Sequence, residues 1–472
     1  MMNPPPTPTS DDHLHFVTGK LAQQAVRDIV DQLASQYGFA YSIDVLPITV
    51  AALMTPKWIG RHLNVPQQTT HIVVPGYCET GLDALAEAHS VVVLRGPKDC
   101  RELPEWFGGE RQPIDLSDHS IEIIAEINHV PRQSIDNVVA TAKRMVADGA
   151  DRIDLGCDPS TRCPVIGDYV AALTDIGITT SIDTFDSWEA QQAVARGASL
   201  VLSVNSSNRQ AAVDWGVEVV AIPDAPGDSH SLENTVQFLD SQGVAMRLDP
   251  ILEPIGAGLA ESLVRYADVR RKYPNRAMMM GIGNLTELTD VDSAGVNLIL
   301  LGICQELGIQ SVLTTEVTNW SRSSVKECDI ARRMTHFAVR NGVPPKRLCD
   351  QLVQLRDPKL RDYPDSGLAD LAESLKDNNY RLFAQRGQLH LIAANTHLTD
   401  SDPFHLFDQL MKQPVSSNVD PGHAFYLGYE LAKASIALQL GKQYNQDQGL
   451  HWGHLTVEED LHRLERKRRS QP

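Results

Sequence analysis

Carboxylate and amide side chains follow the ends of apolar segments in the middle of the chain, and their types and spacing suit a flat polar ligand. In chain order they are Asn128, Asp154, Asp158, Asp183, Asn205, Asp224, Asp249, Asn284, Glu316 and Asn319. A carboxylate accepts two parallel N–H bonds, and an amide offers both a donor and an acceptor. Asp183, Asn205 and Asp249 could therefore hold a heterocycle with adjacent N–H groups.

Helix capping is the alternative role for these residues, because Asp and Asn are favoured at helix N-caps. The alternative stays open for Asp158, Asp183, Asp186, Asp224 and Asp249.

Eight strand–helix units must position these side chains. Apolar strand candidates lie at 121–127, 152–155, 179–184, 200–204, 217–222, 245–248, 277–281 and 311–315, with helical patterns between them. The units span residues 120–343, close to the roughly 250 residues of a (β/α)8 barrel. An open doubly wound sheet is the alternative, but eight consecutive units without a long interruption favour closure. Since barrel sites form at the carboxyl ends of the strands, we expect the ligand there.

Shorter segments flank the predicted barrel. Strands at 14–18, 41–46, 71–74 and 91–94 alternate with helices at 22–37 and 48–63, which predicts a small parallel α/β layer. A hairpin at 380–384 and 389–393, turning near Arg386 and Gly387, precedes a helix from Pro421 or Gly422 to about Lys442. The predicted organisation is a disordered leader (1–12), an N-terminal α/β domain (13–115), a TIM-type barrel (116–350) and a small C-terminal α+β domain (351–472).

The composition limits the class of partner. The 472 residues carry 42 Lys and Arg against 60 Asp and Glu, a formal net charge of −18, which argues against nucleic-acid binding. Seven scattered cysteines indicate a reducing compartment. No segment has the roughly 18 consecutive apolar residues of a membrane span. We therefore expect a cytoplasmic protein with no nucleic-acid or membrane partner.

Several motifs at the predicted strand ends occur in a recognisable order. They are Glu126-Ile127-Asn128, residues 149–156 followed by Ser160-Thr161-Arg162, Ser181-Ile182-Asp183-Thr184, residues 203–208, Leu248-Asp249-Pro250 and residues 280–286. Together they resemble the pterin-binding barrel shared by dihydropteroate synthases and the folate- or pterin-dependent methyltransferases. The resemblance implies that Asp183, Asn205 and Asp249 hold a pterin ring. It also places Asn284 where the methyltransferases have an asparagine that faces the pterin N5 region.

The same resemblance implies roles for three further residues. Asn128 is expected near a Mg²⁺ ion, as a metal ligand, and near the pyrophosphate, while Thr161 and Arg162 are expected beside the pyrophosphate or an arylamine. The implied activity is that of a dihydropteroate synthase-like transferase in folate or tetrahydromethanopterin biosynthesis. It condenses 6-hydroxymethyl-dihydropterin diphosphate with an arylamine. Many barrels of this family pair, which is compatible with a homodimer.

Two segments depart from the synthase pattern. Residues 283–286 stand where synthases have a Ser-Arg-Lys segment, and residues 315–322 stand where synthases have an Arg-x-His element. These departures favour two alternatives, a pterin-dependent methyltransferase component with a corrinoid-carrying partner, or a non-catalytic pterin-binding protein. Both flanks resemble domains of dihydropteroate synthase-related proteins from organisms that use tetrahydromethanopterin.

Overall fold

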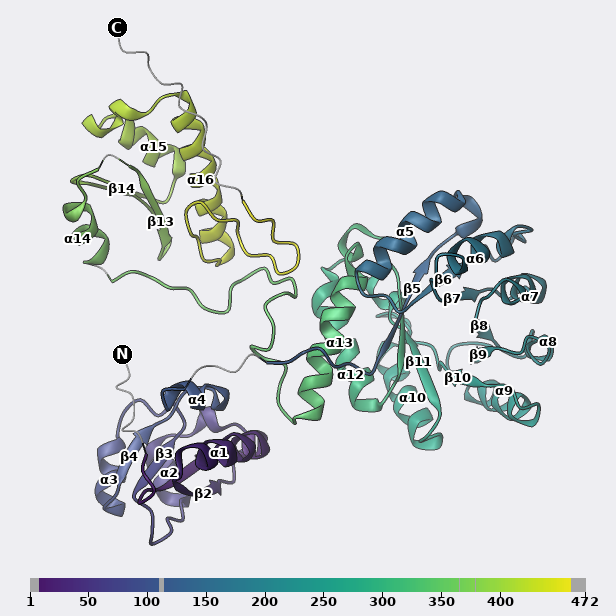
Figure 1. Ribbon diagram of the computed structural model, residues 1–472, viewed down its shortest axis with the longest axis horizontal. Coiled ribbons are helices and arrows are strands. Elements are labelled where there is room, and N and C mark those ends of the chain that lie inside the picture. The colour runs from purple at the N-terminus through teal and green to yellow at the C-terminus, as the bar shows by residue number, and fades with distance from the viewer. Residues whose placement is uncertain (1–7, 110–113, 365, 378, 460–472) are drawn as a thin grey trace. The chain divides into compact units, whose positions relative to one another are not determined.

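The structure is a computed structural model that describes residues 8–109, 114–364, 366–377 and 379–459 (Figure 1). The chain divides into two compact units, residues 1–348 and 349–472. The first unit contains a four-stranded sheet and a closed barrel, and the second contains a three-stranded sheet. Residues 1–7 of the predicted leader lie outside the described ranges. Within those ranges, every helix is too short or too polar to cross a bilayer.

The N-terminal sheet is parallel, with the strand order β2-β1-β3-β4. Its strands are β1 (His13–Thr18), β2 (Ala40–Val45), β3 (His71–Val74) and β4 (Val92–Arg95). The helices are α1 (Gln23–Tyr37), α2 (Pro56–His62), α3 (Leu82–His89) and α4 (Leu103–Trp106), with 3-10 turns η1 (Lys20–Ala22), η2 (Ala51–Leu53) and η3 (Cys100–Glu102). Strands alternating with helices therefore build the expected parallel layer.

The single helix predicted over residues 48–63 is wrong. The chain forms η2, becomes extended at Met54 and Thr55, and begins α2 at Pro56. A residue that precedes proline is disfavoured in the helical region, and proline has no N–H to continue a helix, so Pro56 starts a new one. The Thr55 hydroxyl accepts the Trp58 N–H at 3.3 Å and caps α2.

The middle of the chain forms a closed, parallel eight-stranded barrel, in which β12 pairs with β5. The strands are β5 (Glu122–Ile127), β6 (Arg152–Gly156), β7 (Thr180–Asp183), β8 (Leu200–Val204), β9 (Glu218–Ala221), β10 (Met246–Leu248), β11 (Ala277–Gly281) and β12 (Ser311–Thr314). The helices are α5 (Ile135–Ala147), α6 (Ile166–Thr174), α7 (Ser187–Ala195), α8 (Arg209–Ala212), α9 (Ser229–Ser241), α10 (Leu259–Lys272), α11 (Gly283–Thr286), α12 (Ser293–Leu307) and α13 (Ser324–Arg340), with 3-10 turns η4 (Val130–Arg132) and η5 (Asn319–Ser321). The predicted barrel is confirmed, and the open-sheet alternative is wrong.

Alternate side chains along the strands fill the barrel interior in layers. Near the amino ends, Arg247 forms 2.6 Å ion pairs with Glu122 and Glu218, and Arg152 Nε lies 2.9 Å from Glu122 Oε1. The next layer is an apolar cluster of buried side chains, namely Ile124, Leu200, Leu202, Val220 and Met279. Side chains therefore fill the barrel interior from the amino ends of the strands up to this apolar layer. The space for a ligand lies beyond this layer, at the carboxyl ends of the strands.

The second unit is a three-stranded antiparallel sheet with helices. It comprises α14 (Gly367–Ser374), β13 (Arg381–Gln385), β14 (Gln388–Ala393), β15 (Thr396–Asp400), α15 (Pro403–Met411), η6 (Pro414–Asn418) and α16 (Pro421–Leu440). The hairpin turns at Arg386 and Gly387, whose φ angles of 50° and 77° are those of a two-residue type I′ turn. The sequence did not reveal β15, because no residue of this strand is fully buried and its polar composition hides the alternation.

Candidate functional site

Carboxylates from neighbouring strands face the interior at the carboxyl end of the barrel. Glu126 of β5 is the register partner of Asp154 of β6, and Asp154 is the partner of Ser181 of β7. Register partners on adjacent strands project to the same face of a sheet. Ser181 Oγ donates to Asp154 Oδ1 at 2.6 Å, while Asp154 Oδ2 is buried with no hydrogen-bond partner among the described residues. The layer above the apolar core is therefore acidic.

Burial raises the pKa of each of these acids, since it removes water from the charged form. Burial, followed by the charge of Asp183, raises the pKa of Asp154 to about 8. Burial also raises the pKa of Asp183, against a hydrogen bond from Ser203 that lowers it. The pKa of Glu126 lies well above its ordinary value because of burial and the nearby charges of Asp154 and Asp183. At neutral pH, part of this acidic layer is therefore protonated and able to donate hydrogen bonds.

Asp249, directly after β10, is oriented by hydrogen bonds to one of its oxygens. Its Oδ1 accepts the Tyr266 hydroxyl at 2.5 Å and the Ile251 N–H at 2.8 Å. A Cβ built on Gly281 would lie 3.8 Å from Asp249 Oδ2 and 3.7 Å from the Nδ2 of Asn284, which donates to the Leu252 carbonyl at 3.1 Å, so both polar atoms lie near Gly281. Burial raises the pKa of Asp249 to about 6, although the Tyr266 hydroxyl opposes this shift. A carboxylate oxygen and an amide N–H thus lie beside a glycine that leaves room for a ligand.

Asn205 and Asp183 occupy the ends of the neighbouring strands β8 and β7. A register shift between Val201 and Val204 marks a bulge in β8, and Ser203 adopts a positive φ of 62° within it. The bulge turns the Ser203 side chain to bond with Asp183. Asn205 is almost buried, and its Oδ1 accepts the Ser207 N–H at 3.0 Å. The barrel therefore brings together the ends of β7, β8 and β10. These ends carry Asp183, Asn205 and Asp249, three of the four predicted pterin residues.

The loops that follow β5 and β6 carry the cationic side chains of the site. Asp158 accepts both Arg132 Nε and Arg132 Nη2 at 2.9 Å, and the His129 Nδ1 lies 2.6 Å from it. Arg162 Nε donates to Asp186 at 2.6 Å, and its guanidinium lies over the Trp188 ring, 5.3 Å from the centroid. Both arginines are therefore oriented by a carboxylate.

The capping alternative holds for only one of the five acidic residues. Asp186 caps α7 by accepting the Trp188 N–H at 2.8 Å. Asp183 and Asp249 cap no helix, which keeps their side chains available for a ligand. Asp158 instead binds Arg132, and Asp224 accepts the Ser206 N–H at 3.0 Å.

Asn128 and Thr161, two further predicted residues, lie in different surroundings. Asn128 Nδ2 donates to Glu126 Oε1 at 3.1 Å, which leaves the Asn128 Oδ1 available as an oxygen ligand. Thr161 is exposed on the loop after β6, and its N–H bonds to the Asp158 carbonyl at 3.4 Å. The structure brings Asn128 to the rim beside Glu126 and leaves Thr161 on the surface of the loop.

Residues 315–322, which follow β12, contain one basic residue, Arg322, which is exposed directly after η5. Glu316 is nearly buried and forms a 2.6 Å ion pair with Arg144 of α5. The Thr315 hydroxyl donates to Glu287, another acid near the carboxyl end of the barrel. Both departures from the synthase pattern therefore make this side of the rim more acidic.

Mg²⁺ prefers oxygen ligands and commonly keeps water and substrate phosphates in its coordination shell. The described residues contain no group of three His, Cys, Asp or Glu side chains that could hold a metal by themselves. Oxygen donors beside one another at this end of the barrel include the Asn128 Oδ1, Glu126 and the unpartnered Asp154 Oδ2. They suit a weakly held ion completed by a phosphate-bearing substrate, and they do not form a resident metal centre.

Glu126 is the residue of the acidic layer that the sequence motifs did not single out, whereas Asp154 is among the predicted strand-end residues. Glu126 belongs to a quoted motif, and its position two residues after the interior apolar residue Ile124 could have identified it. The apolar periodicity identifies the strands. Polar side chains at inward-facing positions of those strands form the candidate site.

Comparison with known proteins agrees with this geometry. Residues 127–225, from the end of β5 past β9, match the family described as pterin binding enzyme. Residues 12–98, which span the N-terminal sheet, match a family of unknown function, DUF6513. The matched residues lie within the (β/α)8 barrel and include several of its polar strand ends. The resemblance to pterin-binding barrels drawn from the sequence is confirmed for this part of the chain.

The relatives found extend over different parts of the chain. An uncharacterized protein of Methanocaldococcus jannaschii is 25% identical over 522 aligned positions, which cover 92% of this chain and 98% of that protein. A Yersinia pestis dihydropteroate synthase with a sulfonamide drug complex is 18% identical and covers 48% of this chain and 96% of its own, with a TM-score of 0.39. A Thermus thermophilus dihydropteroate synthase in complex with 4-aminobenzoate is 19% identical over 47% of this chain and 95% of its own, with a TM-score of 0.37. These structural scores are too low to support any statement about activity.

Proposed function

We propose that the carboxyl end of the barrel binds a pterin through Asp249, Asn284, Asp183 and Asn205. The placement of Asp249 Oδ2 and Asn284 Nδ2 near the open space beside Gly281 carries the proposal. A pterin presents adjacent N–H donors on one edge, which suit a carboxylate, and ring nitrogens that suit an amide donor. Tyr266 and Ile251 fix the other oxygen of Asp249, so the acceptor is oriented before the ligand arrives.

The proposed reaction is that of a dihydropteroate synthase-like transferase. The amine nitrogen of an arylamine forms a bond to the methylene carbon of 6-hydroxymethyl-dihydropterin diphosphate, and the bond from that carbon to the diphosphate oxygen breaks. The amine then loses a proton. An arylamine is neutral at pH 7, so the main requirements are alignment of the two reactants and stabilisation of the departing diphosphate.

Residues on the loops after β5 and β6 meet those requirements in the proposal. Arg162, oriented by Asp186, faces the leaving group, and Thr161 precedes it on the same loop. Asn128 offers an amide oxygen at the rim. Mg²⁺ held there with the substrate would neutralise charge on the departing diphosphate.

A pterin-dependent methyltransferase component is the second candidate. It is favoured by the position of Asn284 near Asp249 and by the lack of an Arg-x-His element in residues 315–322. This reaction needs a partner that carries the methyl group, for which a corrinoid protein is the expected class. A pterin-binding protein without catalysis is the third reading.

One set of assays separates the three candidates. Purified protein is incubated with the pterin diphosphate, Mg²⁺ and a panel of arylamines, including aminobenzoate and a ribofuranosylaminobenzene derivative, and pyrophosphate release is measured. Release that depends on the amine supports the transferase. Tight binding of a reduced pterin without pyrophosphate release contradicts it. Methyl loss from a methylated pterin only when a corrinoid protein is added supports the second candidate.

A further inference from the structure

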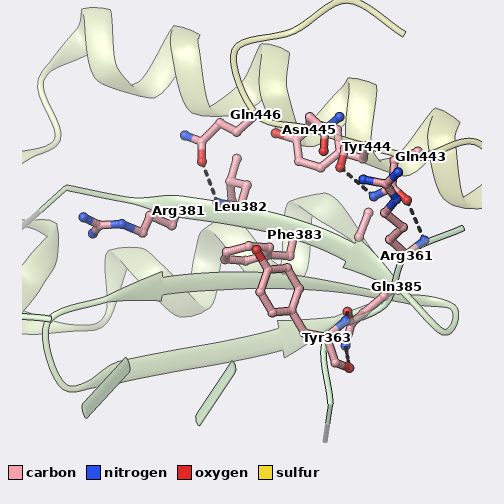
Figure 2. Close-up of a pocket in the computed structure, with 11 residues that line it drawn as sticks. Arg361, Tyr363, Arg381, Leu382, Phe383, Gln385, Gln443, Tyr444, Asn445 and Gln446 are labelled. Atoms are coloured by element: carbon pink, nitrogen blue, oxygen red, sulfur yellow. Dashed lines mark hydrogen bonds between the residues drawn. The ribbon is translucent and has the colours of Figure 1, made fainter. Parts of the chain in front are cut away.

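The second unit contains a pocket with a volume of about 250 Å³ (Figure 2). Three segments line it, namely residues 361–363, the strand β13 and residues 443–446 after α16. Figure 2 shows Tyr363 and Phe383 on one side of β13, and Tyr444 and Asn445 on the other. The strand order β13-β14-β15 makes β13 an edge strand. The pocket therefore lies along an open edge of the sheet.

The hairpin turn determines which backbone groups face this edge. Gln385 and Gln388 flank the two-residue turn, so they form a hydrogen-bonded pair. Pairs alternate along an antiparallel ladder, and residues of the other pairs point their N–H and C=O groups away from the partner strand. Leu382 and Ala384 belong to these other pairs. Their backbone groups therefore face the pocket, and the Leu382 N–H indeed donates to Gln446 Oε1 at 2.8 Å.

Side-chain amides cover both ends of the exposed edge. Gln446 bonds to the Leu382 N–H and donates from Nε2 to the Tyr380 carbonyl at 3.1 Å, as a neighbouring strand would. At the other end, Gln385 Oε1 accepts the Tyr363 N–H at 2.8 Å. Between them, no other described segment pairs with the Leu382 carbonyl or the Ala384 N–H. This gap is too short for an added peptide strand, but it suits one amide edge of a small molecule.

The loop above the gap is held in place by its own contacts. The Tyr444 hydroxyl donates to Glu430 at 2.6 Å, and Gln446 Nε2 lies 2.7 Å from the Tyr426 hydroxyl. The Gln443 N–H donates to Asp357 at 2.8 Å. Because these side chains are already ordered, a ligand loses little free energy in organising the pocket.

The two arginines of the pocket differ in their partners. Arg381 binds both oxygens of Asp377 at 3.0 Å. Arg361 is anchored through its N–H, which donates to Gln443 Oε1 at 2.7 Å, and its guanidinium has no ion pair within the part of the chain that the structure describes. Figure 2 shows the two arginines at opposite ends of the pocket. An anionic group would therefore bind at the Arg361 end.

We propose that this pocket binds a planar lactam heterocycle that carries a carboxylate or phosphate group. The lactam carbonyl accepts the Ala384 N–H, the lactam N–H donates to the Leu382 carbonyl, and the anionic group binds Arg361. The half-exposed Tyr363 ring offers a surface for the heterocycle. The volume is slightly below the roughly 300–1,000 Å³ of drug-sized sites, so the ring system is one of nucleobase or pterin size. The proposal does not depend on the activity of the barrel.

Calorimetric titration of the full chain tests the proposal. The probes are guanosine monophosphate and a carboxypterin, which both combine a lactam with an anion, and adenosine monophosphate, which has the phosphate without the lactam. Titrations are repeated in the Asp249→Asn variant, because a carboxypterin is also a candidate ligand of the barrel. We expect both lactam anions to bind in this variant, and adenosine monophosphate to bind about tenfold more weakly or not at all.

Two substitutions test the contacts one at a time. Arg361→Gln removes the charge, and Ala384→Pro removes one N–H at an edge position, where proline is tolerated. Each should weaken guanosine monophosphate binding about tenfold, while Arg27→Gln on α1 should have no effect. If Ala384→Pro loses its native circular dichroism, Arg361→Gln decides the outcome. The proposal is overturned if neither lactam anion binds to the Asp249→Asn variant, if adenosine monophosphate binds as tightly as guanosine monophosphate, or if Arg361→Gln leaves the affinity unchanged.

Discussion

The ionisation of Asp249 should control pterin affinity. Burial raises its pKa to about 6, and only the ionised carboxylate makes charge-assisted bonds to the N–H groups of the pterin edge. One pH unit below that pKa, only about a tenth of the protein carries the ionised form, so the apparent affinity should fall about tenfold. Well above the pKa, the affinity should be independent of this group.

Two variants isolate the contribution of Asp249. Asp249→Asn removes a buried charge-assisted hydrogen bond worth about 1.5–3 kcal/mol, so pterin should bind about 10–150-fold more weakly at neutral pH. Tyr266→Phe removes a hydroxyl that donates to Asp249 at 2.5 Å and lowers its pKa. In that variant the midpoint of the affinity profile should move to higher pH, while the affinity at alkaline pH changes less.

The assay is fluorescence or calorimetric titration of a reduced pterin across the mildly acidic to alkaline range. Asp154 and Asp183 also titrate in this site, so the decisive quantity is the difference between the profiles of the wild type and Asp249→Asn. A pH step near 6 that survives in Asp249→Asn would refute the assignment. An unchanged affinity in that variant at neutral pH would refute the proposed contact itself.

Three further predictions concern catalysis and stability. Arg162→Ala should reduce pyrophosphate release about 100-fold while leaving the Kd of the bare pterin nearly unchanged, and equal turnover would remove Arg162 from the reaction. Asp154 has a folded-state pKa of about 8 against an ordinary value near 4, so the unfolded chain releases this proton first and stability falls as pH rises from about 4 to about 8. Urea unfolding of Asp154→Asn should show a shallower decline over that window, and an identical slope would contradict the pKa. Arg332 is buried and bonds to Asp151 at 2.5 Å, Asp329 at 2.9 Å and the Ile121 carbonyl at 2.8 Å, so Arg332→Ala should cost about 3–5 kcal/mol in unfolding free energy. Pterin Kd should not change in that variant, and a thermal midpoint equal to that of the wild type would show that the buried network contributes nothing.

The strands of the barrel were predictable because each is a short apolar segment in a regular alternation with helices. β8 (Leu200–Val204) and β11 (Ala277–Gly281) have the predicted bounds. The helix predicted at 48–63 failed because the apolar pattern continues across Pro56, and backbone restrictions at proline outweigh the pattern. β15 was missed because a strand with no fully buried residue has no strong hydrophobic period.

The sequence by itself determined the closed barrel, the family resemblance and the strand ends that carry polar residues, because local periodicity and motif order are properties of neighbouring residues. Only the tertiary structure decided what each polar side chain does. Asp186 caps a helix while Asp183 does not, and Asp249 is oriented by hydrogen bonds from the Tyr266 hydroxyl and the Ile251 N–H. Strand register places Glu126 beside Asp154, whose charge adds to the effect of burial and raises the pKa of Glu126. Such effects depend on burial and on distances between residues far apart in the chain, and no sequence pattern encodes them directly.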